Sequence, residues 1–166
     1  MFRVPESEWR VLRDARLKAL RCSPEAFCGN YARERLVHRR TWRRRARTGQ
    51  WTVARSGGEI VGLAGLLDDP DQELGALTSK CIESVWVHPE RRRRGLVRHM
   101  LGTIEEKAYR QGVGTLVLYV LTANQPAREV YRRLGYHDVG LDSFIEVRRG
   151  WQSRPEPERR LVKSLV

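Results

Sequence analysis

The sequence predicts a single α/β domain spanning residues 1–166, and two observations support this prediction. The first is the order strand, helix, strand: a strand at about Lys80 to Val87, a helix from Gly95 to Gln111, and a continuous apolar run at Thr115 to Leu121 that is typical of a buried strand. That order predicts a right-handed parallel crossover. The second is a length of 166 residues without a repeat or linker, which fits one domain.

Two helices and a hairpin are predicted before the crossover. Gly57 and Gly58 suit the tight turn of the hairpin, and Gly49 ends the helix before it. The predicted segments are a strand at Phe2 to Val4, helices at Glu8 to Leu20 and about Ala32 to Arg47, and strands at Trp51 to Arg55 and Glu59 to Leu66.

A short helix and three strands are predicted after the crossover. Asn124 caps the helix, Pro126 is tolerated in its first turn, and Gly135 ends it. The remaining segments are strands at about Tyr136 to Leu141 and Phe144 to Arg148, a loop at Pro155 and Pro157, and a last strand from Arg160 to Leu165.

The net charge of +12 comes mostly from arginine, because only four of the 32 basic residues are lysine. Such an excess fits nucleic acid, an anionic cofactor or an acidic acceptor, and does not choose among them. The second predicted helix concentrates arginines around Trp42. One interpretation is a non-catalytic protein that binds nucleic acid or an acidic partner. We favour a solvated helix face, since Trp42 alone offers a stacking surface there.

Cysteine usage and hydropathy exclude several classes of protein. Cys22, Cys28 and Cys81 form no CxxC pair and have no zinc-site spacing, so we expect reduced thiols and no metal. No apolar run approaches the roughly 18 residues of a membrane span, and no signal peptide is recognised. We therefore expect a cytoplasmic protein that does not interact with membranes.

The stretch from Ile82 to Arg98 has the form of an anion-binding element. A strand ends at Pro89, the chain turns through four arginines and Gly95, and a helix follows directly. Amides in a tight turn and in the first turn of a helix are unpaired, so they can bind a di- or triphosphate while arginines offset its charge. The stretch therefore predicts a phosphate-bearing ligand.

Two segments around the crossover together resemble the GCN5-related N-acetyltransferase (GNAT) superfamily. The first, Val-His-Pro-Glu-Arg-Arg-Arg-Arg-Gly-Leu-Val from Val87 to Val97, is similar to the acetyl-CoA loop of that family, a proline followed by Arg/Gln-x-x-Gly-x-Gly/Ala. The second is similar to its signature of an Asn, an Ala, an aromatic-Tyr pair and a closing Leu-Gly-aromatic, here between Asn124 and Tyr136. The predicted order of elements also resembles the family's over nearly the whole chain.

The resemblance implies both a fold and a reaction. The fold is a mixed, mostly antiparallel sheet with a parallel, splayed central strand pair and flanking helices. The reaction is acetyl-CoA-dependent N-acetyl transfer to a primary amine by direct attack. A small amine, an antibiotic and a protein amine all remain open as the acceptor, and its pocket is expected near residues 23–27 and 142–157. The family often forms dimers through its C-terminal strands, which leaves a homodimer open.

The resemblance also implies the cofactor-binding residues. Backbone groups of Val85 and Val87 would line the pantetheine arm, with the Val87 amide positioned for the oxyanion, and Asn124 would contact the arm or its ordered water. The pyrophosphate would be held at the start of the helix by Arg92, Arg93, Arg94, Gly95, Val97 and Arg98. Val97 stands where the family usually has Gly or Ala, and its branched side chain puts cofactor affinity in question.

Two residues are candidates for acid and base catalysis. The resemblance assigns the general acid to Tyr131, which is protonated at neutral pH; the alternative is a core tyrosine on an apolar helix face. Glu83 is the candidate base, with a pKa that burial would raise; the alternative is an ion pair with one of the arginines. Cys81 is a third candidate, as an acyl-carrying nucleophile, but no activating base lies near it in the sequence.

Overall fold

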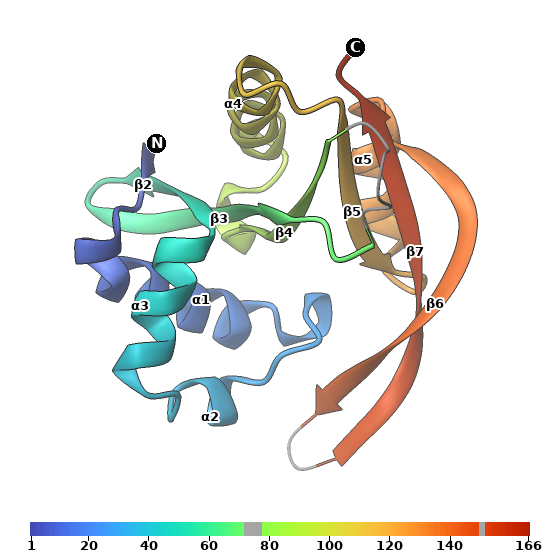
Figure 1. The fold of residues 1–166 in the computed structure, drawn as a ribbon. Coiled ribbons are helices and arrows are strands. Elements are labelled where there is room, and N and C mark those ends of the chain that lie inside the picture. Colours follow the sequence, from blue (N-terminus) through green and yellow to red (C-terminus); the bar gives the residue numbers. More distant parts are fainter. Residues whose placement is uncertain (72–77, 150–151) are drawn as a thin grey trace.

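The computed structural model describes residues 1–71, 78–149 and 152–166, which contain one seven-stranded sheet (Figure 1). The strand order is β1-β2-β3-β4-β5-β7-β6, and only the β4–β5 pair is parallel. This confirms the mixed, mostly antiparallel sheet that the sequence predicted. The strands are β1 (Phe2–Arg3), β2 (Gln50–Ser56), β3 (Glu59–Asp68), β4 (Ser79–Val87), β5 (Thr115–Leu121), β6 (His137–Arg149) and β7 (Gln152–Ser164).

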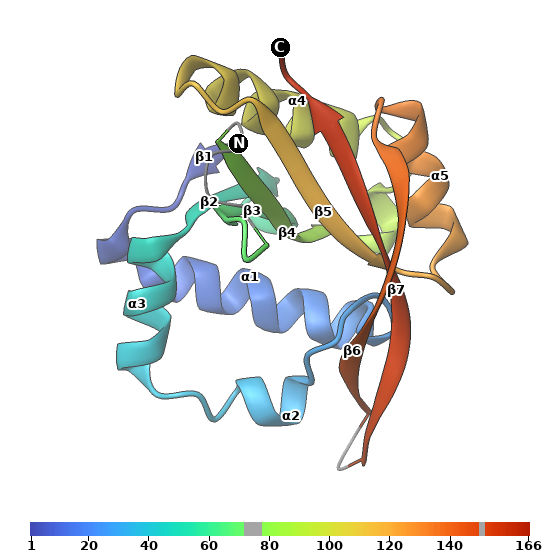
Figure 2. The same cartoon turned by 45° about the vertical axis from the view of Figure 1, so that its right-hand side comes forward.

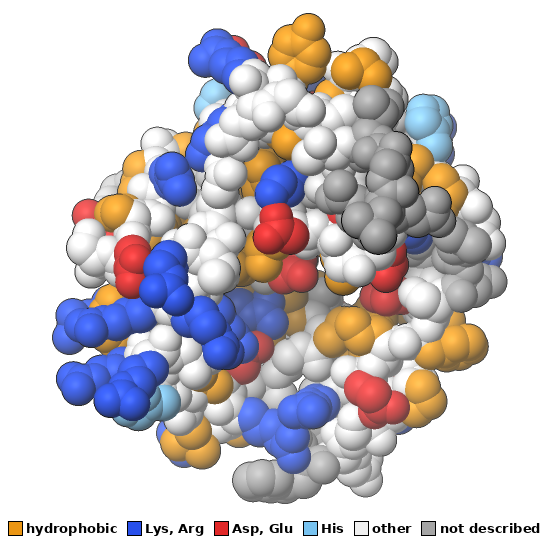
Figure 3. All heavy atoms as spheres, in the orientation of Figure 1, with side chains coloured by type: hydrophobic (Ala, Val, Ile, Leu, Met, Phe, Trp, Pro, Cys, Tyr) orange, Lys and Arg blue, Asp and Glu red, His pale blue; other side chains and the backbone are white. Residues whose placement is uncertain are grey.

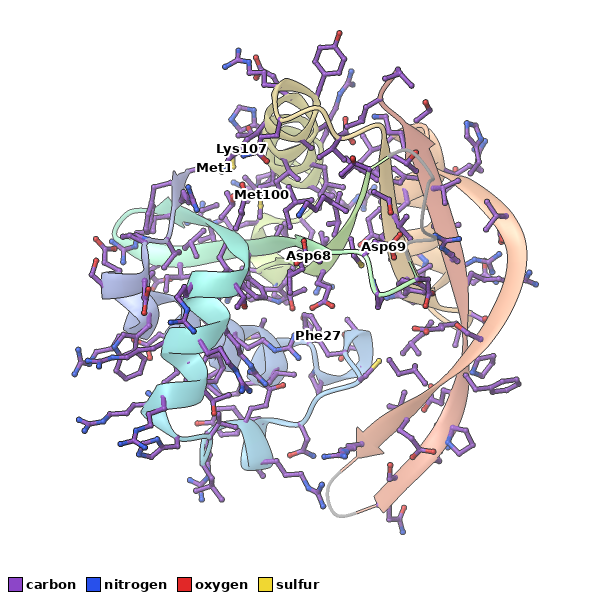
Figure 4. All side chains as sticks on the ribbon, in the orientation of Figure 1. Met1, Phe27, Asp68, Asp69, Met100 and Lys107 are labelled. Atoms are coloured by element: carbon purple, nitrogen blue, oxygen red, sulfur yellow. The ribbon has the colours of Figure 1, made fainter. Side chains whose placement is uncertain are left out.

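Helices cover both faces of the sheet (Figure 2). On one face α4 and α5 pack over a cluster that includes Met100, Leu118 and Tyr131; on the other, α1 and α3 pack over a cluster that includes Leu12 and Trp42. In Figure 4, Met100 and Phe27 accordingly lie on opposite sides of the sheet. The helices are α1 (Trp9–Cys22), α2 (Tyr31–Glu34), α3 (Arg39–Thr48), α4 (Leu96–Arg110) and α5 (Gln125–Arg133), with short 3-10 turns η1 (Glu6–Glu8), η2 (Pro24–Ala26) and η3 (Pro89–Arg91).

The two parallel strands separate halfway along their length. β4 pairs with β5 only from Ser79 to Ile82, opposite Thr115 to Leu118, although both strands continue beyond this point. Beyond Ile82 the register of β4 against β3 also shifts, and Ser84 has a φ of 57°. Such a bulge bends its strand. The predicted splay of the central pair is therefore present, and it leaves a gap between the ends of β4 and β5.

The prediction of one continuous second helix, from about Ala32 to Arg47, is wrong, because two helices, α2 and α3, form instead. His38 has an extended backbone between them, and its Nδ1 accepts a hydrogen bond from the amide of Arg40 at 3.2 Å, so it caps α3. Trp42 is 1% exposed and belongs to the core. It therefore offers no surface for base stacking, which removes the support that it gave to nucleic-acid binding.

The strands after α5 also differ from the prediction. A single strand, β6, replaces the two short ones, and the expected loop at Pro155 and Pro157 lies within β7. Both prolines pair with β6 but lie beyond the end of the β5–β7 ladder. They are two residues apart, so the ring nitrogens that cannot donate face the same side, away from β6. This is why the ladder tolerates them.

None of the helices within the described ranges is long and apolar enough to cross a lipid bilayer.

Candidate active site

The turn between β4 and α4 presents several unpaired amides. Arg93 and Gly95 have left-handed φ values of 60° and 75°, which turn the backbone sharply just before α4 begins. Within the described ranges, no group accepts a hydrogen bond from the amides of Arg93 and Arg94. The amides of residues 96–98 are in the first helical turn and have no helical acceptor. The whole run suits an anion, as the sequence predicted.

Arg92 has a different environment from the arginines that follow it. Its Nε donates to the Val87 carbonyl at 3.1 Å and its Nη2 donates to Ser23 Oγ at 2.7 Å. Trp86 Nε1 donates to the same hydroxyl at 3.2 Å, and Ser23 is completely buried. The Arg92 amide is also engaged, because it donates to the Pro89 carbonyl. Arg92 therefore holds the turn against β4 and the end of α1, and the free amides begin at Arg93.

Three of the other residues predicted to hold the pyrophosphate have side chains that face the solvent. The side chains of Arg93, Arg94 and Arg98 are exposed. Val97 is half-buried, and its side chain packs against the core beneath α4. The branched side chain that put cofactor affinity in question is thus directed inward, away from the face that the free amides form.

The amides of Val85 and Val87 point into the gap between the separated strands. The amide of His88, the residue after Val87, donates to the Val61 carbonyl of β3 at 2.9 Å. Amide directions alternate along an antiparallel strand, so the Val87 amide points away from β3, and that of Val85 does the same. These amides face the side from which β5 has separated.

Asn124 and Tyr131 belong to the segment that follows β5. The Asn124 Oδ1 accepts a hydrogen bond from the Ala127 amide at 3.3 Å, which caps α5 and leaves the side-chain NH₂ available. Tyr131 is 8% exposed and lies in the same packed cluster as Val87. No hydrogen bond to its hydroxyl is found among the described residues, and burial raises the pKa of this phenol. Tyr131 is thus a protonated donor without an acceptor.

A second tyrosine lies beside Tyr131, and its hydroxyl is hydrogen-bonded. The two rings meet edge to face, with 6.1 Å between the ring centres of Tyr131 and Tyr136. The Tyr136 hydroxyl donates to Glu105 at 2.9 Å, and Lys163 donates to the same carboxylate at 2.7 Å. Tyr136 is therefore a structural side chain whose polar group is satisfied.

Glu83 lies next to the bulge of β4. Because the bulge adds one residue, the side chains of Glu83 and Ser84 both lie on the α1 side of the sheet and line the same cavity. Glu83 is exposed, so the burial expected from the sequence is not found. The alternative of an arginine partner is not found either within the part of the chain that the structure describes. Glu83 is thus a free carboxylate beside the bulge.

A cavity of about 160 Å³ lies between the helices and this part of the sheet. Its walls come from α1, α2, α3, β2, β3 and β4, and its lining residues are Leu12, Arg16, Glu34, Trp42, Arg45, Trp51, Leu67, Glu83 and Ser84. A larger cavity of about 720 Å³ lies over α1, α2 and the β2–β3 turn. None of its lining residues comes from β4, β5 or α5, so it is not connected with the gap.

On the face of the molecule that Figure 3 shows, basic and acidic side chains lie in different regions. Basic side chains gather over α3, and carboxylates lie near the centre, where Figure 4 labels Asp68 at the end of β3. Within the small cavity, Glu34 accepts hydrogen bonds from Arg16 at 2.9 Å and from Arg45 at 3.1 Å. Arg16 also donates to Ser84 Oγ at 3.1 Å. These contacts connect three helices to the bulge of β4. They could not be predicted from the sequence, because the partners are far apart along the chain.

Replacing Glu34 with glutamine is expected to lower the free energy of unfolding by about 2–3 kcal/mol at neutral pH, with allowance for partial exposure. Burial opposes ionisation, but Arg16 and Arg45 hold the pKa of this carboxyl below its ordinary value of 4.5. The ionic contribution is therefore complete above pH 4.5 and is lost as the pH falls through the lower folded-state pKa. Urea unfolding over this pH range should show the difference between variant and parent shrinking in acid.

Glu129 provides the control for this prediction, since it is paired with Arg132 and Arg133 on the open surface of α5. Glu129→Gln is expected to leave stability almost unchanged. An equal loss in the two variants, or a Glu34 effect that persists in acid, would contradict the assignment.

Cys81 does not fit the role of an acyl-carrying nucleophile. Its side chain is 2% exposed. Burial, together with the charges of Glu83, Asp69 and Asp71, raises the pKa of this thiol to about 12. It is therefore protonated at neutral pH, and the thiolate is the reactive form. In the described ranges none of the three cysteines forms a disulfide, and no cluster of His, Cys, Asp and Glu could hold a metal ion.

Known proteins resemble this chain in sequence. The profile of the acetyltransferase (GNAT) family matches residues 13–136, which include the β4–α4 turn, Asn124 and Tyr131. Streptothricin acetyltransferase of Streptomyces lavendulae is 39% identical over 64 residues, which make up 39% of this chain and 34% of that protein. The match thus spans about a third of the length of this curated relative.

Solved structures share the fold over almost all of the chain. A ribosomal-protein-alanine N-acetyltransferase from Brucella melitensis superposes with a TM-score of 0.73 and 22% identity, covering 98% of each chain. The putative acetyltransferase yncA from Salmonella typhimurium, determined with acetyl-CoA, has a TM-score of 0.72 and 17% identity, and covers 99% of this chain and 92% of that one. Identities this low establish the shared fold.

Proposed function

Because this chain belongs to the GNAT acetyltransferase family, we propose that it transfers an acetyl group from acetyl-CoA to a primary amine by direct attack. The observation that carries the proposal is the gap where β4 separates from β5. The amide of Val87 points into this gap. Tyr131, whose hydroxyl has no hydrogen-bond partner among the described residues, belongs to the same packed cluster as Val87. A donor for a developing oxyanion and a donor for a leaving group thus lie in one region.

The residues around the gap fit acetyl-CoA in charge and in hydrogen-bonding groups. The free amides from Arg93 to Arg98 would hold the pyrophosphate, and the exposed arginines would offset its charge. The backbone of Val85 and Val87 and the free NH₂ of Asn124 would contact the pantetheine arm. Bound acetyl-CoA supplies the activated acetyl thioester.

Groups around the gap would then stabilise the developing charge and transfer protons. The Val87 amide donates to the thioester oxygen as negative charge develops there. Tyr131, kept protonated by its raised pKa, hydrogen-bonds to the departing sulfur and gives it a proton. Glu83, directly or through water, takes the proton that the attacking amine loses. This proton then returns to Tyr131 through solvent. One proton leaves nitrogen and one reaches sulfur, so the reaction balances.

Glu83→Gln is expected to reduce kcat/KM about 10²- to 10⁴-fold if the carboxylate is the base, because the amide cannot accept the proton. The control is Asp68→Asn, which neutralises a carboxylate that is 88% exposed at the end of the neighbouring strand. Initial rates with a saturating acetyl-CoA concentration would measure both. Unchanged rates for Glu83→Gln would exclude this residue as the base.

An acceptor panel tests the function as a whole. The protein would be incubated with acetyl-CoA and with amines, peptides, amino acids and antibiotics, and release of the free CoA thiol would be recorded. Thermal unfolding with and without acetyl-CoA tests binding separately, since a ligand specific for the folded state raises the melting temperature. A protein that acetyl-CoA stabilises but that releases no thiol with any acceptor would contradict the proposed function.

A further inference from the structure

Three of the four lysines in this chain are ion-paired with a carboxylate. The pairs are Lys18 with Glu59 at 3.6 Å, Lys163 with Glu105 at 2.7 Å, and Lys80 with Asp68. A nearby negative charge favours the protonated form of an amine, and a protonated amine is not a nucleophile. These three side chains are therefore protected from acylating reagents.

The fourth lysine, Lys107, lies in the last turn of α4 and has a different environment. No carboxylate forms an ion pair with it among the described residues. On a helix, the side chains three and four residues away are the nearest neighbours. For Lys107 these are Thr103, Ile104, Arg110 and Gln111, and none of them is acidic. The helix thus supplies Lys107 with no negative charge.

Lys107 lines a further cavity of about 160 Å³, between α4 and strands β1 to β3. In Figure 4 it lies beside Met1, which lines the same cavity. The other lining residues are Phe2, Arg3, Gln50, Thr52, Leu66, Thr103 and Ile104. The charged groups that face Lys107 are therefore Arg3 and the amino group of Met1, which are both positive.

This environment favours the neutral form of the amine. Burial and the positive charge of Arg3 both lower the pKa of Lys107 below its ordinary value of 10.5. Burial acts because it penalises the charged form, and Arg3 acts by repulsion. Lysine amines are mostly protonated at neutral pH, so their rate of attack follows the fraction that is neutral. That fraction is larger at Lys107 than at an ordinary lysine.

We propose that Lys107 is a modification site, whose amine reacts directly with the thioester of acetyl-CoA to form acetyl-lysine. The nitrogen attacks the thioester carbonyl, an N–C bond forms, and the C–S bond breaks. The proton that nitrogen loses passes through water to the departing thiolate. The added acetyl group is small enough to lie in the cavity, where Phe2, Leu66 and Ile104 provide apolar contact.

This reaction does not use the gap between β4 and β5. Lys107 is eleven residues from the start of α4, which is about 16 Å along the helix. The inference therefore requires acetyl-CoA as a reagent, and it does not depend on the acetyl transfer to an added amine that is proposed above.

The other three lysines are internal controls, because the side chains of Lys18, Lys80 and Lys163 are 23%, 27% and 25% exposed and Lys107 is also half-buried. The protein would be incubated with acetyl-CoA to low conversion and digested with a protease that does not cleave at lysine. Mass spectrometry would then give the initial rate at each site. We expect the rate at Lys107 to be at least about threefold higher than at each paired lysine. Equal rates at the four lysines would overturn the proposal.

Thr103→Glu supplies the missing carboxylate, four residues before Lys107, in the order that best pairs Glu with Lys on a helix. It is expected to slow acetylation of Lys107 to the rate of the paired lysines. Thr103→Gln is the matched control, since it has nearly the same shape without the charge and should keep the parental rate. Both variants lose the hydrogen bond from Thr103 to the His99 carbonyl, so this loss cancels. Equal rates in the two variants would contradict the proposal.

Arg3→Gln removes the neighbouring positive charge, so that more of the Lys107 amine is protonated at a given pH. The rate at Lys107 should fall about twofold. Arg47→Gln makes the same change of charge at an exposed position of α3 that does not line the cavity, and should leave the rate unchanged. The same loss of rate in both variants would show that net charge, rather than the surroundings of Lys107, decides.

Protein concentration separates direct reaction from catalysis by a second copy of the chain. The rate per molecule at Lys107 should not change with protein concentration, and Lys107 should also react fastest with a small acetyl thioester that lacks the nucleotide of CoA. A rate per molecule that rises with protein concentration would show transfer between copies and would overturn the direct reaction. Preferential acetylation of Lys107 without CoA release to any added amine would support this inference and overturn the proposed function.

Discussion

Tyr131→Phe is expected to lower kcat about 10²- to 10⁴-fold while leaving KM for acetyl-CoA nearly unchanged. The substitution removes the proton donor proposed for the departing thiolate and leaves the ring in place. Stability should not fall, because the substitution removes no hydrogen bond between Tyr131 and another described residue. Steady-state rates at saturating acceptor, together with urea unfolding of the same sample, would measure both effects.

Tyr136→Phe provides the matched control, since its ring touches that of Tyr131 and its hydroxyl is bonded to Glu105. This variant should lose about 1 kcal/mol of stability and retain its kcat. We therefore expect Tyr131→Phe to lower kcat and keep the parental stability, and Tyr136→Phe to lower stability and keep the parental kcat. If Tyr131→Phe kept the parental kcat, Tyr131 would be a core residue only and another acid would be required.

Arg92→Ala is expected to reduce the free energy of unfolding by about 1–3 kcal/mol and to weaken acetyl-CoA binding at least about tenfold. The guanidinium is the group that fixes the β4–α4 turn to the Val87 carbonyl and to Ser23. Without it, the amides that follow lose their fixed direction, although Arg92 itself is not expected to touch the phosphates. Urea unfolding and calorimetric titration with acetyl-CoA would give the two quantities.

Arg94→Ala removes an exposed arginine from the same turn and serves as the control. Its stability should stay within about 0.5 kcal/mol of the parent, and its loss of affinity should vanish at high salt because only screened charge is removed. The effect of Arg92→Ala should persist at high salt. Identical behaviour of the two variants would show that Arg92 contributes charge rather than geometry.

The sequence predicted the parts of the fold that short-range signals determine. Gly57 and Gly58 both have positive φ in the β2–β3 turn, and Asn124 caps α5, as expected. One error was local: His38 caps α3 through its own side chain, and histidine is not one of the usual N-cap residues. The other depended on a longer-range contact, because Pro155 and Pro157 enter a strand only where the β5–β7 ladder has ended.

In the candidate site, too, the sequence predicted the features that neighbouring residues determine and missed the long-range contacts. The free amides after Arg92 follow from a proline, a glycine and a helix start that are adjacent in the chain, so the sequence was sufficient to predict the turn. The role of Ser23 was not predictable, because its partners Trp86 and Arg92 lie more than sixty residues away. The same is true of the contact between Arg16 and Ser84.

The separation of β4 from β5 creates an edge strand in the middle of a sheet. Exposed strand edges ordinarily recruit other chains and promote aggregation. Here the unpaired edge is short, because β4 ends at Val87, five residues after its last pair with β5 at Ile82. We expect the pantetheine arm of acetyl-CoA to pair with Val85 and Val87 at this edge. Amide hydrogen exchange at these residues should therefore slow sharply on acetyl-CoA binding, while exchange at the already paired Cys81 and Ile82 changes little.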